Sequence, residues 1–425
     1  MATLELIRHL PRRAEIVDGC VRWVPRKDLK PVDGLPQICW EDGRTWAEAN
    51  LWALQQATSQ RKDLETVKSA MRCLHAYAKW LEQEEINWWH FPARESDRCL
   101  NRYRGALIAA RDAEQIAPSL ASARMSTVVR FYRWLEATRL LSSEWPMWGE
   151  RQIGIKLTDT FGLQHTLNIR STNLAIPNRR VAGSDNLEDG LLPVSANAAL
   201  RIMEFADAEA SSELALMLRL GFQTGLRLGS ICDLKMRTIE RAVEDPSLRG
   251  WYRLSVGPGA HPRVRTKFGV TGQVPVPADL LSQLQTYAFS TRRLKRQALA
   301  AKEHRETLFL TRFGAPYAAD RDSRAVNVEM GRLRKAGVAA GIHSLYDFNF
   351  HRTRATFATE LTRAALRAGM NPADALVLVR DACLHRDEKT TWRYIRFVEK
   401  SAAMAEMADA FTTAMMGLVR KAGHA

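Results

Sequence analysis

The stretch QTGLRLGSICDLKMRTI, residues 223–239, sets a single arginine, Arg227, directly after a Thr-Gly pair. The glycines Gly225 and Gly229 flank it, and glycine allows a tight turn and the close approach of another group. Taken alone the segment also fits an ordinary surface arginine. The role of Arg227 therefore depends on which partner residues the rest of the chain supplies.

Three later segments carry residues suited to one common chemistry. FNFHRTRATFATEL, residues 348–361, sets His351 and Arg354 at i and i+3, on one face if the segment is helical. CLHRDEKTTWRYIRF, residues 383–397, contains His385 and, further on, Tyr394. TKFGVTGQVPVP, residues 266–277, sets Lys267 at the bend of a predicted β-hairpin. Each segment is weak evidence alone, whereas all four in this order are hard to obtain by accident.

These four segments resemble the motifs of the tyrosine recombinase, or phage integrase, family. The resemblance covers about residues 190–400 by motif and residues 45–141 by helical pattern alone. It implies a catalytic set of Arg227, Lys267, His351, Arg354, His385 and Tyr394. The chain departs from the family pattern at three positions: Ser230 stands where an acid is usual, Ala355 where a histidine is common, and Leu384 where glycine is usual. None of these departures removes a reacting group.

The implied roles agree with the chemistry of the side chains. Arginine is always protonated and offers a planar fork, so Arg227 and Arg354 suit the charge that develops on phosphate oxygens. A phenol ordinarily has a pKa near 10, so Tyr394 attacks only when held in line and relieved of its proton. The resemblance implies a 3′-phosphotyrosyl link. It also implies that Lys267 protonates the leaving 5′-oxygen, that His351 assists proton transfer, and that His385 binds the phosphate.

Composition favours a polyanionic partner. The chain has 62 Lys and Arg against 47 Asp and Glu, a net charge of +15, and a pI near 9.8. This balance makes nucleic acid the first candidate partner. No apolar run is long enough for a membrane span, and the first residues do not resemble a secretory signal. We therefore expect no membrane partner and a cytoplasmic, bacterial protein that associates with the nucleoid when bound to DNA.

Metal and cofactor chemistry have no support in the motifs. Six scattered cysteines form no C-x-x-C pair, which favours reduced thiols over a zinc site or a disulfide framework. No Gly-rich phosphate loop accompanies the four segments. We expect no cofactor and no metal.

Hydrophobic periodicity predicts a mainly α-helical chain with a small antiparallel β-sheet. Helical spacing runs through 45–145, fades in a Pro-, Gly- and Asn-containing stretch, and resumes after it, with Ser195 as a helix cap. The predicted order is an N-terminal extension (1–44), a helical core-type DNA-binding domain (45–145), a linker (146–191), an α+β catalytic domain (192–400) and a tail helix (401–425). The two domains are expected to clamp duplex DNA. The extension is interpreted as an arm that contacts DNA or a protein, or as a solvated segment.

Basic residues recur on the predicted helices beside the apolar stripes. They are Lys68, Arg72 and Lys79 in one helix and Arg124, Arg130 and Arg133 in another, and Arg265 adds to them in the hairpin. Such residues suit a phosphate backbone, although a merely solvated face explains each helix taken alone. In the tail, Met404, Met407, Phe411 and Met415 form an apolar stripe. In the family such a tail reaches a neighbouring protomer, and packing on its own domain is the alternative.

Length favours a site-specific recombinase of a mobile element, an integrase or transposase, over a housekeeping chromosome-dimer resolvase. The expected partners are double-stranded DNA with inverted-repeat core sites, a tetrameric synapse of the chain on that DNA, and an accessory recombinase or element-encoded protein. Two alternatives stay open: a type IB topoisomerase that relaxes DNA, and a DNA-binding regulator that does not cleave.

Overall fold

The computed structural model describes residues 1–26, 28–60, 62–158, 164–178, 187, 190–317 and 325–422. The chain divides into two compact units, residues 1–182 and 183–425. Each unit has a large hydrophobic core of its own. The point of division lies within the stretch predicted as a linker.

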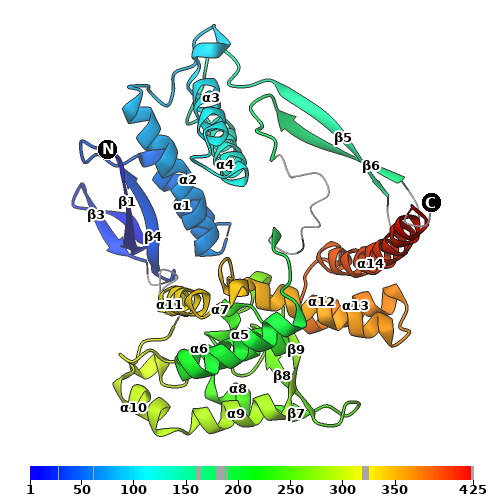
Figure 1. Cartoon of the computed structure of the whole chain (residues 1–425). Coiled ribbons are helices and arrows are strands. Elements are labelled where there is room, and N and C mark those ends of the chain that lie inside the picture. Colours follow the sequence, from blue (N-terminus) through cyan, green and yellow to red (C-terminus); the bar gives the residue numbers. More distant parts are fainter. Residues whose placement is uncertain are drawn as a thin grey trace. The chain divides into compact units, whose positions relative to one another are not determined.

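The first unit contains four helices and six strands in its described residues (Figure 1). The helices are α1 (Ala47–Thr58), α2 (Leu64–Gln83), α3 (Cys99–Asp112) and α4 (Pro118–Ala137). The strands are β1 (Thr3–His9), β2 (Arg12–Val17), β3 (Cys20–Pro25), β4 (Val32–Cys39), β5 (Glu150–Thr158) and β6 (Gln164–Thr172). They form three antiparallel pairs, β1 with β4, β2 with β3 and β5 with β6.

Amphipathic patterning explains the helices of this unit. The side chain of Asp63 accepts a hydrogen bond from the Glu65 N–H and caps α2. The predicted apolar stripes are buried in one core, with Met71 and Leu74 of α2 beside Val128 and Tyr132 of α4. The hydrophobic contacts therefore hold the helices together as the periodicity predicts.

The sequence left open whether residues 1–44 are a solvated segment. Only one of the two strand pairs formed there is solvated. Ile38 of β4 is fully buried, Ala2 beside β1 is 1% exposed, and both belong to the helical core. The β2–β3 ribbon is different, because Ile16 and Trp23 are largely exposed. The β1–β4 pair is therefore part of this unit's hydrophobic core, and the β2–β3 pair is not.

The predicted linker also contains regular structure. β5 and β6 pair over their whole described length. Leu174 and Ile176, which follow β6, are buried in the core of the first unit. A long part of the predicted linker, 146–191, is thus a β-hairpin followed by residues that pack in the core of the first unit.

The second unit is helical around a three-stranded antiparallel sheet of order β7-β8-β9 (Figure 1). The strands are β7 (Val243–Glu244), β8 (Trp251–Val256) and β9 (Gly272–Pro277). The helices are α5 (Ala196–Glu209), α6 (Ser212–Thr224), α7 (Leu228–Ile231), α8 (Met236–Glu240), α9 (Ala278–Ala288), α10 (Thr291–Leu299), α11 (Ala325–Ala339), α12 (His351–Arg367), α13 (Pro372–Cys383) and α14 (Glu388–Ala422). Ser195 caps α5 as predicted, accepting a hydrogen bond from the Ala198 N–H.

The tail is continuous with the second unit. One helix, α14, carries Tyr394 and continues to the end of the described chain (Figure 1). Met404 and Met407 are about half exposed, whereas the side chains of Phe411 and Met415 lie outside the described residues.

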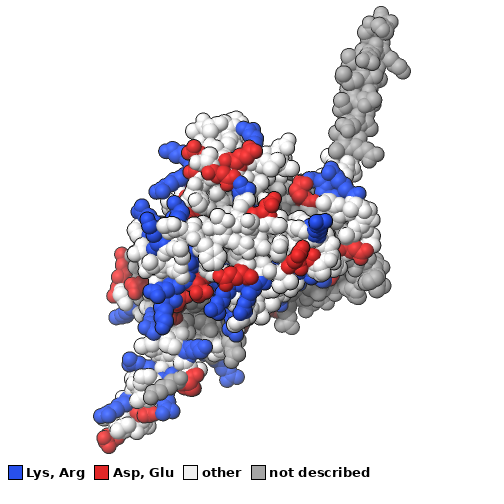
Figure 2. Space-filling view, turned by 90° about the horizontal axis from the view of Figure 1, so that it is seen from below, with Lys and Arg blue, Asp and Glu red and all other residues white. Residues whose placement is uncertain are grey.

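Surface charge is mixed on the face drawn in Figure 2, where Lys and Arg side chains are interspersed with Asp and Glu. Charge density on this face therefore does not by itself mark a DNA-binding surface. Within the described part of the chain, no helix has the length and apolar character needed to cross a bilayer.

Candidate active site

Arg227 lies in a short turn between two helices. α6 ends at Gly225, which has φ +66°, in the left-handed region that favours glycine. Arg227 then begins α7, and its carbonyl accepts the N–H groups of Ser230 at 2.9 Å and Ile231 at 3.0 Å. The position of the Arg227 backbone is thus set by the tight turn that the two flanking glycines suggested.

Arg354 joins this turn to α12. Its side chain is almost entirely buried, at 3% exposed, and its Nη1 donates to the Gly225 carbonyl at 2.7 Å. Gly225 also contacts α12 closely, because a Cβ built there would lie 3.0 Å from Cε1 of Phe357. The guanidinium of Arg354 is therefore held at Gly225, which lies two residues before Arg227 in the chain.

His385 and Tyr394 lie together at the junction of α13 and α14. Their rings stack at a centroid distance of 5.9 Å and an interplanar angle of 11°. The Nδ1 of His385 lies 2.9 Å from Oγ1 of the buried Thr391, which fixes the orientation of the imidazole. Tyr394 is fully buried, in a cluster with Leu187, Ala358, Val379 and Cys383.

Leu384 adopts the left-handed conformation that glycine usually supplies. It ends α13 with φ 52° and ψ 47°. Its side chain is buried in the core of the unit, and a Cβ built at Gly272 would lie 2.5 Å from its Cδ2. Packing against β9 therefore supports a strained backbone directly before His385.

Lys267 is exposed in the 3-10 turn Lys267–Gly269, which lies between β8 and β9. Its Nζ lies 5.4 Å from the ring centroid of Phe268, and the guanidinium carbon of Arg386 lies 5.8 Å from the same ring. Phe268 has φ +66°, so it is a second left-handed residue other than glycine at the site. These contacts link the Lys267 turn to the residue after His385.

His351 is the first residue of α12 and is exposed. It shares the first turn of this helix with the buried Arg354. The elements that carry these residues contact one another, since α12 packs on α6, α13 and α14, and α13 packs on β9. The sequence did not reveal Thr391 or Phe268, because their partners depend on tertiary contacts.

The residues predicted to bind DNA differ in exposure. Lys68 is 8% exposed, its Nζ lies 3.5 Å from a Glu65 oxygen, and Gly34 of β4 covers it. Its predicted place on an exposed face is therefore wrong. Arg72, Arg130 and Arg265 are exposed, and the remaining predicted residues are half-buried: Lys79, Arg124 and Arg133.

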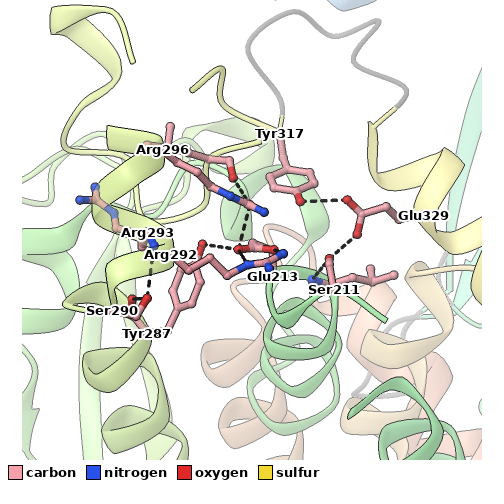
Figure 3. Close-up of polar contacts among 11 residues, drawn as sticks. Ser211, Glu213, Tyr287, Ser290, Arg292, Arg293, Arg296, Tyr317 and Glu329 are labelled. Atoms are coloured by element: carbon pink, nitrogen blue, oxygen red, sulfur yellow. Dashed lines mark hydrogen bonds and ion pairs between the residues drawn. The ribbon is translucent and has the colours of Figure 1, made fainter. Parts of the chain in front are cut away.

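A buried ion cluster, shown in Figure 3, braces α6 against α9 and α10. Glu213 is fully buried and accepts hydrogen bonds from Arg292 through Nε and Nη2, both at 2.9 Å, and from the Tyr287 hydroxyl at 2.9 Å. Arg296 Nη1 lies 2.8 Å from the same carboxylate. Burial raises the pKa of Glu213. The hydrogen bond from Arg292 and the charge of Arg296 lower it by more, so the pKa lies below its ordinary value. The sequence did not predict this cluster.

A cavity of about 930 Å³ opens beside the ion cluster. Its lining includes Arg292 and Arg296, with Tyr317 donating to Glu329 at 2.9 Å, and contains none of the six predicted catalytic residues. Among the residues that the structure describes, no group of three or more His, Cys, Asp or Glu side chains is arranged to hold a metal ion.

Residues 194–400 match the sequence model of the phage integrase family, so this segment is similar to that family. No curated protein matches the chain by sequence.

Two solved structures share the fold at 14% sequence identity. One is the XerH site-specific recombinase bound to a palindromic difH substrate in a post-cleavage complex, covering 84% of each chain with a TM-score of 0.50. The other is the Tn1549 transposon integrase in complex with transposon right end DNA, covering 85% of this chain and 98% of that chain, also with a TM-score of 0.50.

Proposed function

We propose that the chain is a site-specific recombinase of a mobile element, an integrase or transposase, that uses Tyr394 as its nucleophile. The stacking of Tyr394 on His385, whose ring is fixed by Thr391, carries this proposal. The match of residues 194–400 to the phage integrase family supports the activity. The mobile-element assignment rests on chain length, and the Tn1549 integrase is a transposon protein of similar fold.

The proposed reaction is a transesterification that conserves the energy of the phosphodiester. Tyr394 Oη attacks the phosphorus in line, a P–O bond to tyrosine forms, and the bond to the 5′-oxygen breaks. The phenolic proton passes to His351 and Lys267 protonates the departing oxygen. Arg227, Arg354 and His385 bind the phosphate oxygens. A 5′-hydroxyl of another strand then reverses these steps, so neither hydrolysis nor ATP is required.

The burial of Tyr394 requires a local rearrangement before attack. A fully buried hydroxyl is out of reach of a DNA phosphate, so α14 must shift relative to α12 and α13. Cleavage is therefore expected to depend on assembly of the protein on DNA.

DNA binding is assigned to both units, which would clamp the duplex. Exposed and half-buried arginines on α2 and α4 support phosphate contacts by the first unit, whereas Lys68 is withdrawn from this set. The exposed Met404 and Met407 support a contact of the tail with a neighbouring protomer in a tetramer on inverted-repeat sites. An element-encoded accessory protein is a further proposed partner, and a bacterial nucleoid is the proposed place of action.

The test is covalent capture on a nicked duplex that contains an end of the surrounding mobile element. The wild type should form a protein–DNA adduct that survives a denaturing gel. Tyr394→Phe should retain DNA binding and form no adduct, because only the hydroxyl is lost. Tyr346→Phe is the matched control, since Tyr346 is 79% exposed and lies outside the proposed site.

Three results would overturn the proposal. An adduct formed by Tyr394→Phe would assign the nucleophile elsewhere. General relaxation of a supercoiled plasmid without an element end would favour a type IB topoisomerase, and binding without cleavage by the wild type would favour a regulator.

A further inference from the structure

Asp233 lies two residues after α7, on the turn that carries Arg227. Its N–H donates to the Ser230 carbonyl at 3.1 Å, and the N–H of Ser230 donates to the Arg227 carbonyl at 2.9 Å. The backbone of the next residue, Leu234, accepts the N–H of Leu308 at 2.8 Å. The backbone at Asp233 is therefore fixed by hydrogen bonds on both sides.

The carboxylate of Asp233 reaches the segment that leads to Lys267. One oxygen, Oδ2, accepts the backbone N–H of Arg265 at 2.6 Å, and the other lies 2.7 Å from the Nζ of Lys235. The Asp233 side chain is about one-third exposed, at 32%. A hydrogen bond from a backbone N–H to a charged acceptor is stronger than one between neutral groups. Asp233 thus ties the Arg227 turn to the hairpin, two residues before Lys267.

The Arg265 side chain follows its backbone onto the same turn. A Cβ built at Gly229 would lie 3.5 Å from Nη2 of Arg265. Burial raises the pKa of Cys232 to about 12, and the charge of Arg265 opposes this rise. Arg265 therefore lies over the α7 turn, which gives it a role beside the DNA contact predicted from the sequence.

Lys267 is exposed and its side chain is long and flexible. Its position therefore depends on how the hairpin turn is attached to the rest of the unit. At the other end of the turn, the Thr266 hydroxyl donates to the Val270 carbonyl at 2.6 Å, which closes the loop on itself. Neither that bond nor the Phe268 contacts reach the Arg227 turn, whereas the Asp233–Arg265 bond does. Ser230, which stands where the resembling family usually has an acid, leaves Asp233 as the carboxylate of this turn.

We propose that Asp233 is a positioning residue that holds Lys267 in register with Arg227 for protonation of the leaving 5′-oxygen. The inference rests on the proposed function, because it assumes that Lys267 is the general acid. It assigns no contact of Asp233 with DNA.

The experiment compares Asp233→Ala on a normal duplex and on one with sulfur in place of the bridging 5′-oxygen. A thiolate leaves without a proton, so a fault in proton donation disappears on the sulfur substrate. Displacement of the acid by about 1 Å should slow cleavage of the normal duplex by about 10²-fold, and most of this loss should be recovered on the sulfur substrate. Lys267→Ala together with Asp233→Ala should cleave the normal duplex no more slowly than Lys267→Ala alone.

Asp245→Asn is the matched control. Asp245 accepts the N–H groups of Ser247 and Leu248 and pairs with Arg253 on β8, away from the Lys267 turn. Its loss should lower stability without a preference for the sulfur substrate. Asp233→Asn keeps an acceptor oxygen and is the second variant, expected to show a smaller defect with the same recovery.

Equal defects of the Asp233 variants on both substrates would overturn the inference and leave Asp233 as support for Arg227 or for the fold. Failure of the wild type to cleave either substrate would instead refute the proposed function. If Asp233→Ala does not fold, the Asp233→Asn comparison decides.

Discussion

Gly225→Ala is expected to damage stability and cleavage together. Gly225 has φ +66°, and forcing an alanine into the left-handed region costs about 1–2 kcal/mol. The added Cβ would also crowd the ring of Phe357, with Cε1 at 3.0 Å and Cδ1 nearer still. Overpacking of this kind costs about 1–3 kcal/mol. The sum is a loss of about 2–5 kcal/mol in the free energy of unfolding.

The structure provides a control that separates these two contributions. Gly250 has φ +80°, and a Cβ there would meet nothing within 4 Å, so Gly250→Ala carries the backbone cost alone. Urea denaturation of both variants should show a further loss of about 1–3 kcal/mol for Gly225→Ala. Because the Gly225 carbonyl holds Arg354 at 2.7 Å, covalent capture should also fall by about 10²-fold in this variant alone. Equal stability and equal cleavage of the two variants would refute the reasoning.

Arg227→Lys and Arg354→Lys should each lower the single-turnover cleavage rate about as far as the alanine substitution does, by about 10²–10³-fold. The reason is that an ammonium lacks the two parallel donors of a guanidinium. Near-wild-type rates would contradict the proposed binding of the phosphate by these arginines. Glu213→Gln should destabilise the fold by about 3–5 kcal/mol in urea denaturation, because Arg292 and Arg296 lose their buried counter-charge. The pKa of Glu213 is lowered in the fold, so its contribution to stability is complete above the unfolded value of about 4.3 and is lost as pH falls through the folded value. The glutamine variant should lose this acid dependence, and an unchanged acid limb would argue against the cluster.

The sequence predicted the helical architecture because helical patterning depends on local order, and it supplied a candidate site that stays a prediction. Helical spacing of apolar residues marks the buried stripes of α2 and α4, as Met71 and Val128 illustrate. The candidate catalytic residues follow the motif order along the chain, so the sequence alone could propose them before their positions were known.

The rest depends on partners distant in the chain. Lys68 has the spacing of an exposed basic residue, but β4 lies against α2, and Gly34 brings its backbone over the lysine. The bond of Asp233 to Arg265 likewise joins segments that only the folded sheet brings together. Hydrophobic periodicity carries no information on such contacts.

The contact of Leu384 with Gly272 has a consequence for how this site varies among related sequences. The leucine occupies the space into which any side chain at position 272 would project, and it does so from a backbone conformation that glycine adopts more easily. A sequence with glycine at position 384 has room for a side chain on β9, whereas this chain does not. The two positions should therefore covary, and a library that randomises position 272 alone will sample mostly clashes.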